Sequence, residues 1–278
     1  MTLWHSEDDP QLDKLDAIGW ALAFFRFVGL AVVIYGLMIV LAVTRLLETP
    51  FKKRLVSPFI VQMACKASLV VLGLKVTTSG RPMRHKGAMV SNHASWLDIF
   101  TLNAVQRGFF VSKSEVHGWP LIGLIARSTG TVFIQRKASD AKVQKSQFEQ
   151  RLITGDRLIF FPEGTSTDSL RVLPFKSTLF AAFFEPHLRK TMWIQPVTVN
   201  YFAPKGQDAR FYGWWGDMEF APHFLMSLGA KRQGRVEIRF HEPVKVADFA
   251  DRKSLARHCE DRVRGGLVAR GDAVSPQP

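Results

Sequence analysis

Apolar positions run without interruption near the N-terminus. The 18 residues from Phe27 to Thr44 carry no charge, and the apolar character extends upstream over Ile18 to Phe25, before Arg26. At about 1.5 Å per residue, a helix of this length reaches about 27 Å, close to the roughly 30 Å of a bilayer's hydrocarbon layer. A buried core helix is the alternative, but a helix this long and apolar on all sides is unusual in a soluble domain of this size. The pattern predicts a membrane-anchoring helix.

The charges on either side of this helix predict its orientation. Residues 1–20 contain five acidic side chains and one lysine, which is not typical of a cleaved signal peptide. Four basic residues lie between Arg45 and Arg54, which by the positive-inside rule places the rest of the chain on the cytoplasmic side. A second apolar stretch, Phe59 to Leu74, contains polar interruptions and fits either an interfacial helix or a core helix. We expect residues 1–70 to form a membrane-anchoring helical region.

Beyond Gly80 the pattern changes to short β-rich runs that alternate with helical ones. This alternation predicts an α/β domain over residues 71–272, with a mixed, largely parallel sheet flanked by helices, and a flexible tail at 273–278. The predicted strands are Lys75 to Thr78, Ala88 to Ser91, Phe109 to Ser112, Thr131 to Gln135, Arg157 to Phe161, Trp193 to Tyr201 and Val236 to Phe240. The predicted helices lie near Ser95 to Gln106, Trp119 to Ser128, Ser139 to Thr154, Lys176 to Phe184 and Asp251 to Val268.

Composition narrows the classes of partner. The 278 residues include 37 Lys and Arg against 24 Asp and Glu, a net charge of +13 that favours an anionic partner, either nucleic acid or an anionic membrane. The basic residues are scattered and no nucleic-acid module is recognisable, so we expect no nucleic-acid partner. Cys65 and Cys259 are far apart, which argues against a disulfide framework and favours a reducing compartment.

The first candidate for chemistry is the segment from Ser91 to Asp98, which follows a predicted strand. If a helix starts at Ser95, His93 lies in the turn before it and the Asp98 carboxylate can reach back to the imidazole, an arrangement typical of a general base. The same residues fit a simple capping pattern, in which Asp98 binds helix N-terminal amides. They are also possible metal ligands, but no further ligand cluster lies at a suitable spacing, so we expect no metal.

The second candidate is the loop from Phe161 to Asp168. Its sequence, Phe-Pro-Glu-Gly-Thr-Ser-Thr-Asp, offers backbone amides and three hydroxyls suited to an oxygen-rich headgroup. A plain strand-to-helix turn capped by Thr165 or Ser166 is the alternative interpretation.

Four blocks taken together resemble the glycerolipid acyltransferase family, which includes the bacterial lysophosphatidic acid acyltransferases. These blocks are Asn92-His93 with Asp98, the segment from Gly130 to Arg136, the segment from Phe161 to Thr165, and Gln195-Pro196-Val197. They occur in the family's order over about residues 70 to 240, so the combination is far more specific than any single block.

The resemblance implies acyl transfer from a thioester of acyl carrier protein or coenzyme A to the hydroxyl of a lipid, with no other cofactor. It implies that His93 is the general base, that Asp98 orients it, and that the enzyme acts on membrane lipids at the cytoplasmic face of a bacterial inner membrane. The residues expected to bind substrate are Asn92, Lys113, Arg136, Glu163, Gly164, Thr165, Ser166 and Lys176.

The chain departs from the lysophosphatidic acid enzymes at Ser166. Those enzymes typically have an arginine there, which is a natural fork for phosphate. Together with the segments from Arg171 to Ser177 and from Tyr212 to Met218, this serine resembles the subgroup that acylates lyso-ornithine lipids and related aminolipids. We therefore expect the acceptor to be the 3-hydroxyl of a lyso-aminolipid; the alternative is 1-acylglycerol-3-phosphate, which would give phosphatidic acid.

Overall fold

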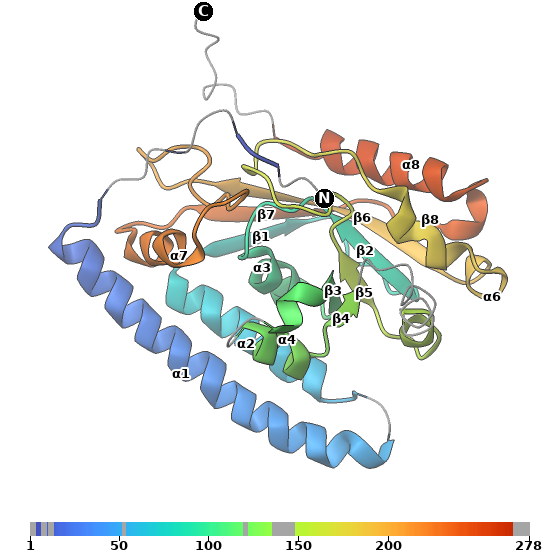
Figure 1. The fold of residues 1–278 in the computed structure, drawn as a ribbon, viewed down its shortest axis with the longest axis horizontal. Coiled ribbons are helices and arrows are strands. Elements are labelled where there is room, and N and C mark those ends of the chain that lie inside the picture. The colour runs from blue at the N-terminus through green and yellow to red at the C-terminus, as the bar shows by residue number, and fades with distance from the viewer. Residues whose placement is uncertain are drawn as a thin grey trace, which may run out of the picture.

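The computed structural model describes residues 4–6, 10, 14–51, 54–118, 122–134 and 148–268. Its centre is an eight-stranded sheet with the order β1-β7-β6-β2-β5-β3-β4, in which β8 pairs with β6 (Figure 1). The strands are β1 (Lys75–Ser79), β2 (Gly87–Ser91), β3 (Phe109–Lys113), β4 (Val132–Ile134), β5 (Leu158–Phe160), β6 (Trp193–Phe202), β7 (Arg235–Phe240) and β8 (Val244–Lys245).

The sheet is mixed and mostly parallel, as predicted. Strands β4, β3, β5, β2 and β6 run in one direction, and β7 and β8 are antiparallel to β6. All seven predicted strands are present, with ends that differ from the prediction by one residue at most. Because β6, β2, β5, β3 and β4 are parallel, the loops that follow β2, β5, β3 and β4 meet at one edge of the sheet.

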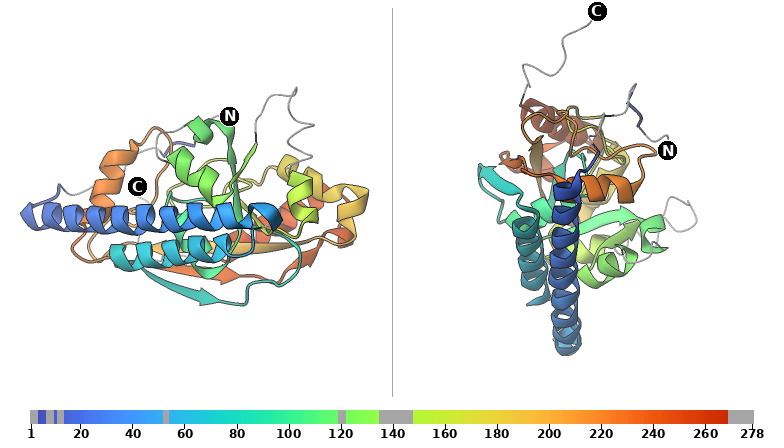
Figure 2. Two further views of the ribbon diagram at one scale, coloured as in Figure 1. Left: turned by 90° about the horizontal axis from the view of Figure 1, so that it is seen from below. Right: turned by 90° about the vertical axis from the view of Figure 1, so that its left-hand side faces the viewer.

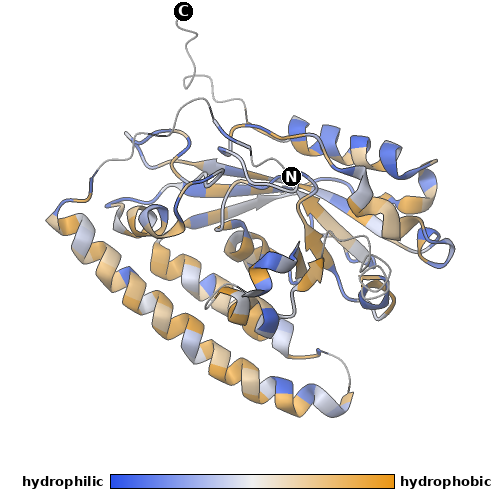
Figure 3. Cartoon of the chain, in the orientation of Figure 1, coloured by the Kyte–Doolittle hydropathy of each residue, from blue (hydrophilic) through white to orange (hydrophobic). Residues whose placement is uncertain are grey.

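The N-terminal apolar segment forms a helical hairpin. Helix α1 (Ala17–Glu48) begins at Asp16, whose side chain accepts a hydrogen bond from the backbone N–H of Gly19 at 2.9 Å. It lies beside helix α2 (Ser57–Leu72), and both are largely apolar along their length (Figures 1, 2 and 3). The guanidinium of Arg26, the one charge in the apolar part of α1, donates to the carbonyls of Leu228 and Ala230 at 2.6 and 2.7 Å. This arginine therefore fastens α1 to the α/β domain.

The remaining helices cover the two faces of the sheet. One face carries α1, α2, α3 (Asp98–Val105) and α7 (Phe220–Gly229), and the other carries α8 (Arg252–Gly265) and the 3₁₀ helix η3 (Ser177–Phe184) (Figure 1). The other helical elements are η1 (Thr49–Phe51), η2 (Ser114–Gly118), α4 (Ile122–Thr129), α6 (Pro186–Arg189) and η4 (Val246–Asp248).

Three helix predictions need correction. The helix expected from Ser95 begins only at Asp98, because the carboxylate of Asp98 accepts hydrogen bonds from the backbone N–H groups of Ala94 and Ser95 and holds them in a turn. The helix expected over 176–184 is a 3₁₀ helix, in which the buried Phe180 and Phe183 stand three residues apart, the repeat of that helix.

The third correction is α7, a helix that the prediction omitted. Of the helix predicted over 139–154, residues 148–153 are helical and 139–147 lie outside the described residues. The tail predicted at 273–278 also lies outside them.

The sheet separates two clusters of buried side chains. In the fully buried β2, Met89 packs with the cluster that includes Leu30, Leu69 and other residues of α1 and α2, whereas Ala88 and Val90 face the cluster beneath α8. The helical hairpin thus shares a core with the sheet, which fixes its position relative to the α/β domain.

Candidate active site

The site begins where β2 ends. Asn92 follows the last residue of β2 and is fully buried. Its side-chain Nδ2 donates to the Val199 carbonyl at 3.0 Å, and its Oδ1 accepts from the Val199 N–H at 2.9 Å. The carboxamide thereby takes the place of a backbone pair with β6 and directs the next residue, His93, out of the sheet. In this structure the Asn92 side chain therefore holds the loop against β6.

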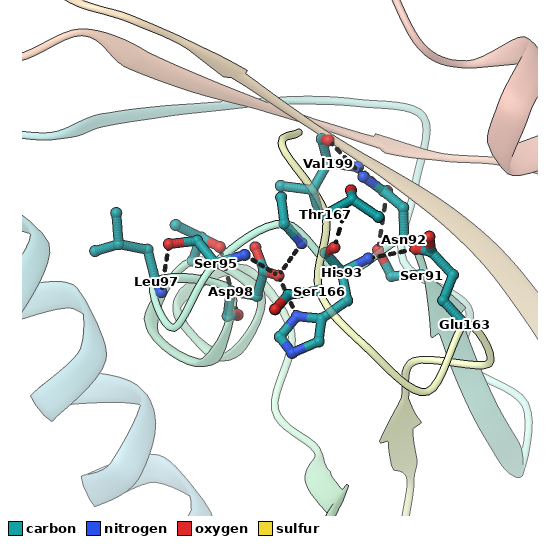
Figure 4. A network of polar contacts seen from close by, with 12 residues as sticks. Ser91, Asn92, His93, Ser95, Leu97, Asp98, Glu163, Ser166, Thr167 and Val199 are labelled. Carbon is teal, nitrogen blue, oxygen red and sulfur yellow. Dashed lines mark hydrogen bonds and ion pairs between the residues drawn. The ribbon is translucent and has the colours of Figure 1, made fainter. Parts of the chain in front are cut away.

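His93 and Asp98 are in direct contact (Figure 4). The imidazole Nδ1 lies 2.7 Å from Oδ2 of Asp98, whose side chain is fully buried. The same oxygen accepts the backbone N–H groups of Ala94 at 2.9 Å and Ser95 at 3.1 Å. The two interpretations of this segment are therefore compatible, since one carboxylate both secures the turn and binds the histidine.

A fourth donor to Asp98 comes from β6. The hydroxyl of Tyr201 donates to Oδ1 of Asp98 at 2.7 Å, and the tyrosine side chain is fully buried. Burial and the adjacent Asp98 charge raise the pKa of Tyr201 well above its ordinary value, so the hydroxyl stays protonated and keeps donating. Both carboxylate oxygens are thus satisfied, and the carboxylate has a fixed orientation.

The imidazole presents its other nitrogen outward. The ring of His93 stacks on Phe161, with 4.1 Å between centroids and 11° between planes, and its side chain is 24% exposed. Within the described part of the chain, Nε2 has no hydrogen-bond partner. With Nδ1–H donating to a carboxylate, the lone pair on Nε2 is available to accept a proton.

Glu163 supports the backbone of His93. Its Oε1 accepts the N–H of His93 and its Oε2 accepts the N–H of Leu173, each at 2.7 Å, while the backbone N–H of Thr167 donates to the His93 carbonyl at 2.9 Å. Burial raises the pKa of Glu163 to about 8, and its two amide donors act in the opposite direction. With its side chain 1% exposed, Glu163 holds the two loops together.

The residues after Glu163 line the open side of the pair. Gly164 has φ of 72°, a left-handed conformation that favours glycine, and its backbone N–H closes a turn on the Phe161 carbonyl at 3.1 Å. Thr165 and Ser166 are half-buried, and Figure 4 shows Ser166 close to the imidazole. The Ser166 side chain is therefore near the open Nε2 of the imidazole.

The other predicted substrate-binding residues are Lys113, Lys176 and Arg136. Lys113 ends β3 and Lys176 precedes η3; the strand register puts Lys113 at the same sheet edge as His93. The backbone N–H of Lys176 donates to the carbonyl of Pro162 at 2.9 Å, which places Lys176 next to the Glu163 loop. Arg136 lies outside the described residues.

Known proteins resemble this chain in sequence and in fold. The Acyltransferase family model matches residues 74–200. Lyso-ornithine lipid O-acyltransferase from Rhodobacter capsulatus is 51% identical over 96% of this chain and 98% of its own, and that from Brucella abortus is 41% identical over 71% and 77%. The crystal structure of the 1-acyl-sn-glycerophosphate acyltransferase PlsC from Thermotoga maritima is 22% identical and superimposes with a TM-score of 0.64, covering 89% of this chain and 94% of that one.

The PlsC structure agrees with the observed fold. The family model covers the segment that contains His93 and Asp98, and the Rhodobacter capsulatus relative covers nearly the whole chain. The chain therefore belongs to the acyltransferase family, in the group that includes the lyso-ornithine lipid O-acyltransferases, and the protein is an acyltransferase.

Proposed function

We propose that the protein is a membrane-bound O-acyltransferase that moves a fatty acyl group from an acyl thioester to the 3-hydroxyl of a lyso-aminolipid of the lyso-ornithine type. The observation that carries the chemistry is the His93 imidazole, bonded to buried Asp98 through Nδ1 and open at Nε2. The acceptor follows from Ser166 and from the two relatives, both named for lyso-ornithine lipid.

The proposed reaction uses His93 as the base. Nε2 removes the proton of the acceptor hydroxyl, and Asp98 stabilises the imidazolium. The oxygen attacks the thioester carbonyl to form a tetrahedral intermediate; its collapse forms the ester C–O bond and breaks the C–S bond. His93 then returns the proton to the departing thiolate. Acyl carrier protein is the proposed donor and coenzyme A the alternative.

The position of Ser166 favours an acceptor without phosphate. A lyso-ornithine headgroup carries an amino acid, and its free hydroxyl lies on the amide-linked acyl chain, so the loop must accommodate polar groups without a phosphate fork. The half-buried hydroxyls of Thr165 and Ser166 can donate and accept single hydrogen bonds. An arginine would instead favour bidentate binding of phosphate.

Ser166→Arg is expected to shift acceptor preference toward lysophosphatidic acid by about 10-fold, because hydrogen bonds to charged groups contribute about 1.5–3 kcal/mol. The measurement is the ratio of kcat/KM for lysophosphatidic acid to kcat/KM for lyso-ornithine lipid. Ser166→Gln, which adds bulk but no charge, is the control. An unchanged ratio in Ser166→Arg would refute the role of this position in headgroup choice.

Tyr201→Phe is expected to lower kcat about 10-fold and leave KM for the acyl donor unchanged. Without the hydroxyl, Oδ1 of Asp98 loses a hydrogen bond that stabilises its charge. The carboxylate is then oriented less firmly, and so is the His93 imidazole that it binds, which lowers kcat without changing donor binding. A variant with a lower Tm but a wild-type kcat would show that Tyr201 is only structural.

The helical hairpin is the proposed membrane attachment. Its exposed apolar side chains include Phe24, Phe25, Val32, Ile39, Leu46 and Leu47 of α1 and Phe59, Met63 and Val70 of α2. Helix α1 is long and apolar enough to cross a bilayer by length and composition. The basic residues at its C-terminal end support a catalytic domain on the cytoplasmic face of the inner membrane.

Product analysis tests the proposed reaction. The purified full chain in mixed micelles is incubated with lyso-ornithine lipid and an acyl thioester of acyl carrier protein, and the product is analysed by tandem mass spectrometry. We expect one new alkali-labile ester on the 3-hydroxyl. An acyl amide on the δ-amine, or no product with either thioester donor, would contradict the proposal.

A further inference from the structure

A positively charged cleft lies at the opposite edge of the sheet from His93. It has a volume of about 660 Å³ and is lined by Arg81, Pro82, Met83, Arg84, Gln106, Arg107 and Arg157. These residues come from the segments that precede β2, β3 and β5, whereas the catalytic loop follows β2. The five residues of β2 separate the two edges by about 16 Å. The cleft is therefore distinct from the proposed active site.

The cleft concentrates positive charge without a counter-charge. Four of its seven lining residues are arginines and none is acidic. The Nε of Arg157 is buried and has no hydrogen-bond partner within the described part of the chain. Burial lowers the pKa of Arg157, and the charge of Arg107 lowers it further. A buried donor without a partner, close to other cations, lowers the stability of the folded protein unless an anion binds there.

The cleft borders the apolar surface of the helical hairpin. The guanidinium of Arg107 lies 3.9 Å from the ring centroid of Phe59 and donates to Oε1 of Gln62 at 2.9 Å, and both partners belong to α2. Phe59 and the nearby Met63 are 49% and 59% exposed. A lipid whose chains contact these two side chains would bring its headgroup to the arginines.

We propose that the cleft of Arg81, Arg84, Arg107 and Arg157 binds the phosphate group of an anionic phospholipid at the membrane surface. Guanidinium groups match phosphate oxygens in geometry as well as charge. The site would hold the domain in a fixed orientation on the bilayer while His93, at the other edge of the sheet, receives the lipid substrate. The proposal depends on membrane attachment through the hairpin, but not on the identity of the acceptor.

The test is a calorimetric titration of the full chain in neutral detergent with dihexanoyl phosphatidylglycerol, dihexanoyl phosphatidylcholine or inorganic phosphate. The wild type should bind the phosphatidylglycerol about 10-fold more tightly than either of the other probes. Arg84→Gln/Arg157→Gln should weaken that binding about 10-fold. Lys253→Gln/Arg257→Gln, an equal change of charge at exposed positions of α8, is the control and should have no effect.

A second cleft variant controls for a folding defect caused by replacing the partly buried Arg157. Arg81→Gln/Arg84→Gln replaces exposed side chains only and should reproduce the loss. Equal weakening in cleft and control variants, or equal affinity for phosphatidylcholine, would overturn the proposal. Inorganic phosphate binding as tightly as phosphatidylglycerol would reassign the cleft to free phosphate and overturn it as well. Co-sedimentation with phosphatidylcholine vesicles reports hairpin attachment separately.

Discussion

Replacing His93 with alanine is expected to reduce kcat/KM for acyl transfer by about 10²- to 10⁴-fold, the usual contribution of a general base. Without the imidazole, no group in the described loop is placed to remove the proton of the acceptor hydroxyl. Folding should survive, because the backbone N–H and carbonyl of residue 93 keep their bonds to Glu163 and Thr167. Asp98 also keeps Ala94, Ser95 and Tyr201 as donors.

The measurement compares steady-state kinetics of purified His93→Ala and wild type, with circular dichroism and vesicle co-sedimentation as checks of fold and attachment. His187→Ala is the matched control, since His187 is about half exposed and lies on α6, away from the pair. The control should retain wild-type turnover. Turnover of His93→Ala within 10-fold of wild type would remove His93 from its proposed role.

Asp98→Asn should cause the second largest loss, also about 10²- to 10⁴-fold in kcat/KM. The side-chain amide presents an N–H group to the imidazole, which favours the tautomer with its proton on Nε2 and so blocks proton removal. Because the backbone N–H groups of Ala94 and Ser95 then face a donor or lose their acceptor, the free energy of unfolding should also fall by about 1–3 kcal/mol.

A double variant separates these two effects. If His93 and Asp98 act as one unit, His93→Ala/Asp98→Asn should lose no more activity than the larger of the two single losses. Losses that multiply would show that the two side chains act independently and would contradict the proposed pair. Thermal unfolding of the same three variants measures the structural cost of removing the carboxylate.

Local sequence patterns were sufficient to predict the strands of the sheet and helix α1. The strands β2 and β5 are short, mostly apolar runs that are buried on both faces of the sheet, so each can be recognised from its local sequence alone. The apolar run within α1 is equally clear. Helix α7 was missed because its buried face includes His223 and Ser227, although Pro222 in its first turn is a typical start signal.

The site was only partly predictable, because its key contacts join distant segments. The contact between His93 and Asp98 spans five residues and follows from local spacing. The bond from Tyr201 to Asp98 spans 103 residues, and that from Glu163 to the His93 backbone spans 70. Hydrophobic periodicity along the chain carries no information about contacts between segments this far apart. Tyr201 in the buried strand β6 was an available signal, since a buried hydroxyl needs a partner.

For the same reason, the sequence does not show which distant backbone groups Asn92 and Glu163 contact. Both were predicted to bind substrate, yet their polar atoms are bonded to backbone groups of Val199, His93 and Leu173. In this structure they hold the backbone around His93, and Ser166 lies near the open nitrogen of the imidazole.

The most direct test of the central claim is a competition assay. Equimolar lyso-ornithine lipid and lysophosphatidic acid are offered together in mixed micelles to the purified enzyme with one acyl thioester donor, and both products are quantified by mass spectrometry. The account predicts that ornithine lipid forms at least about 10-fold faster, the effect of one well-matched charged or polar contact. Phosphatidic acid as the major product, or equal amounts of the two, would contradict it.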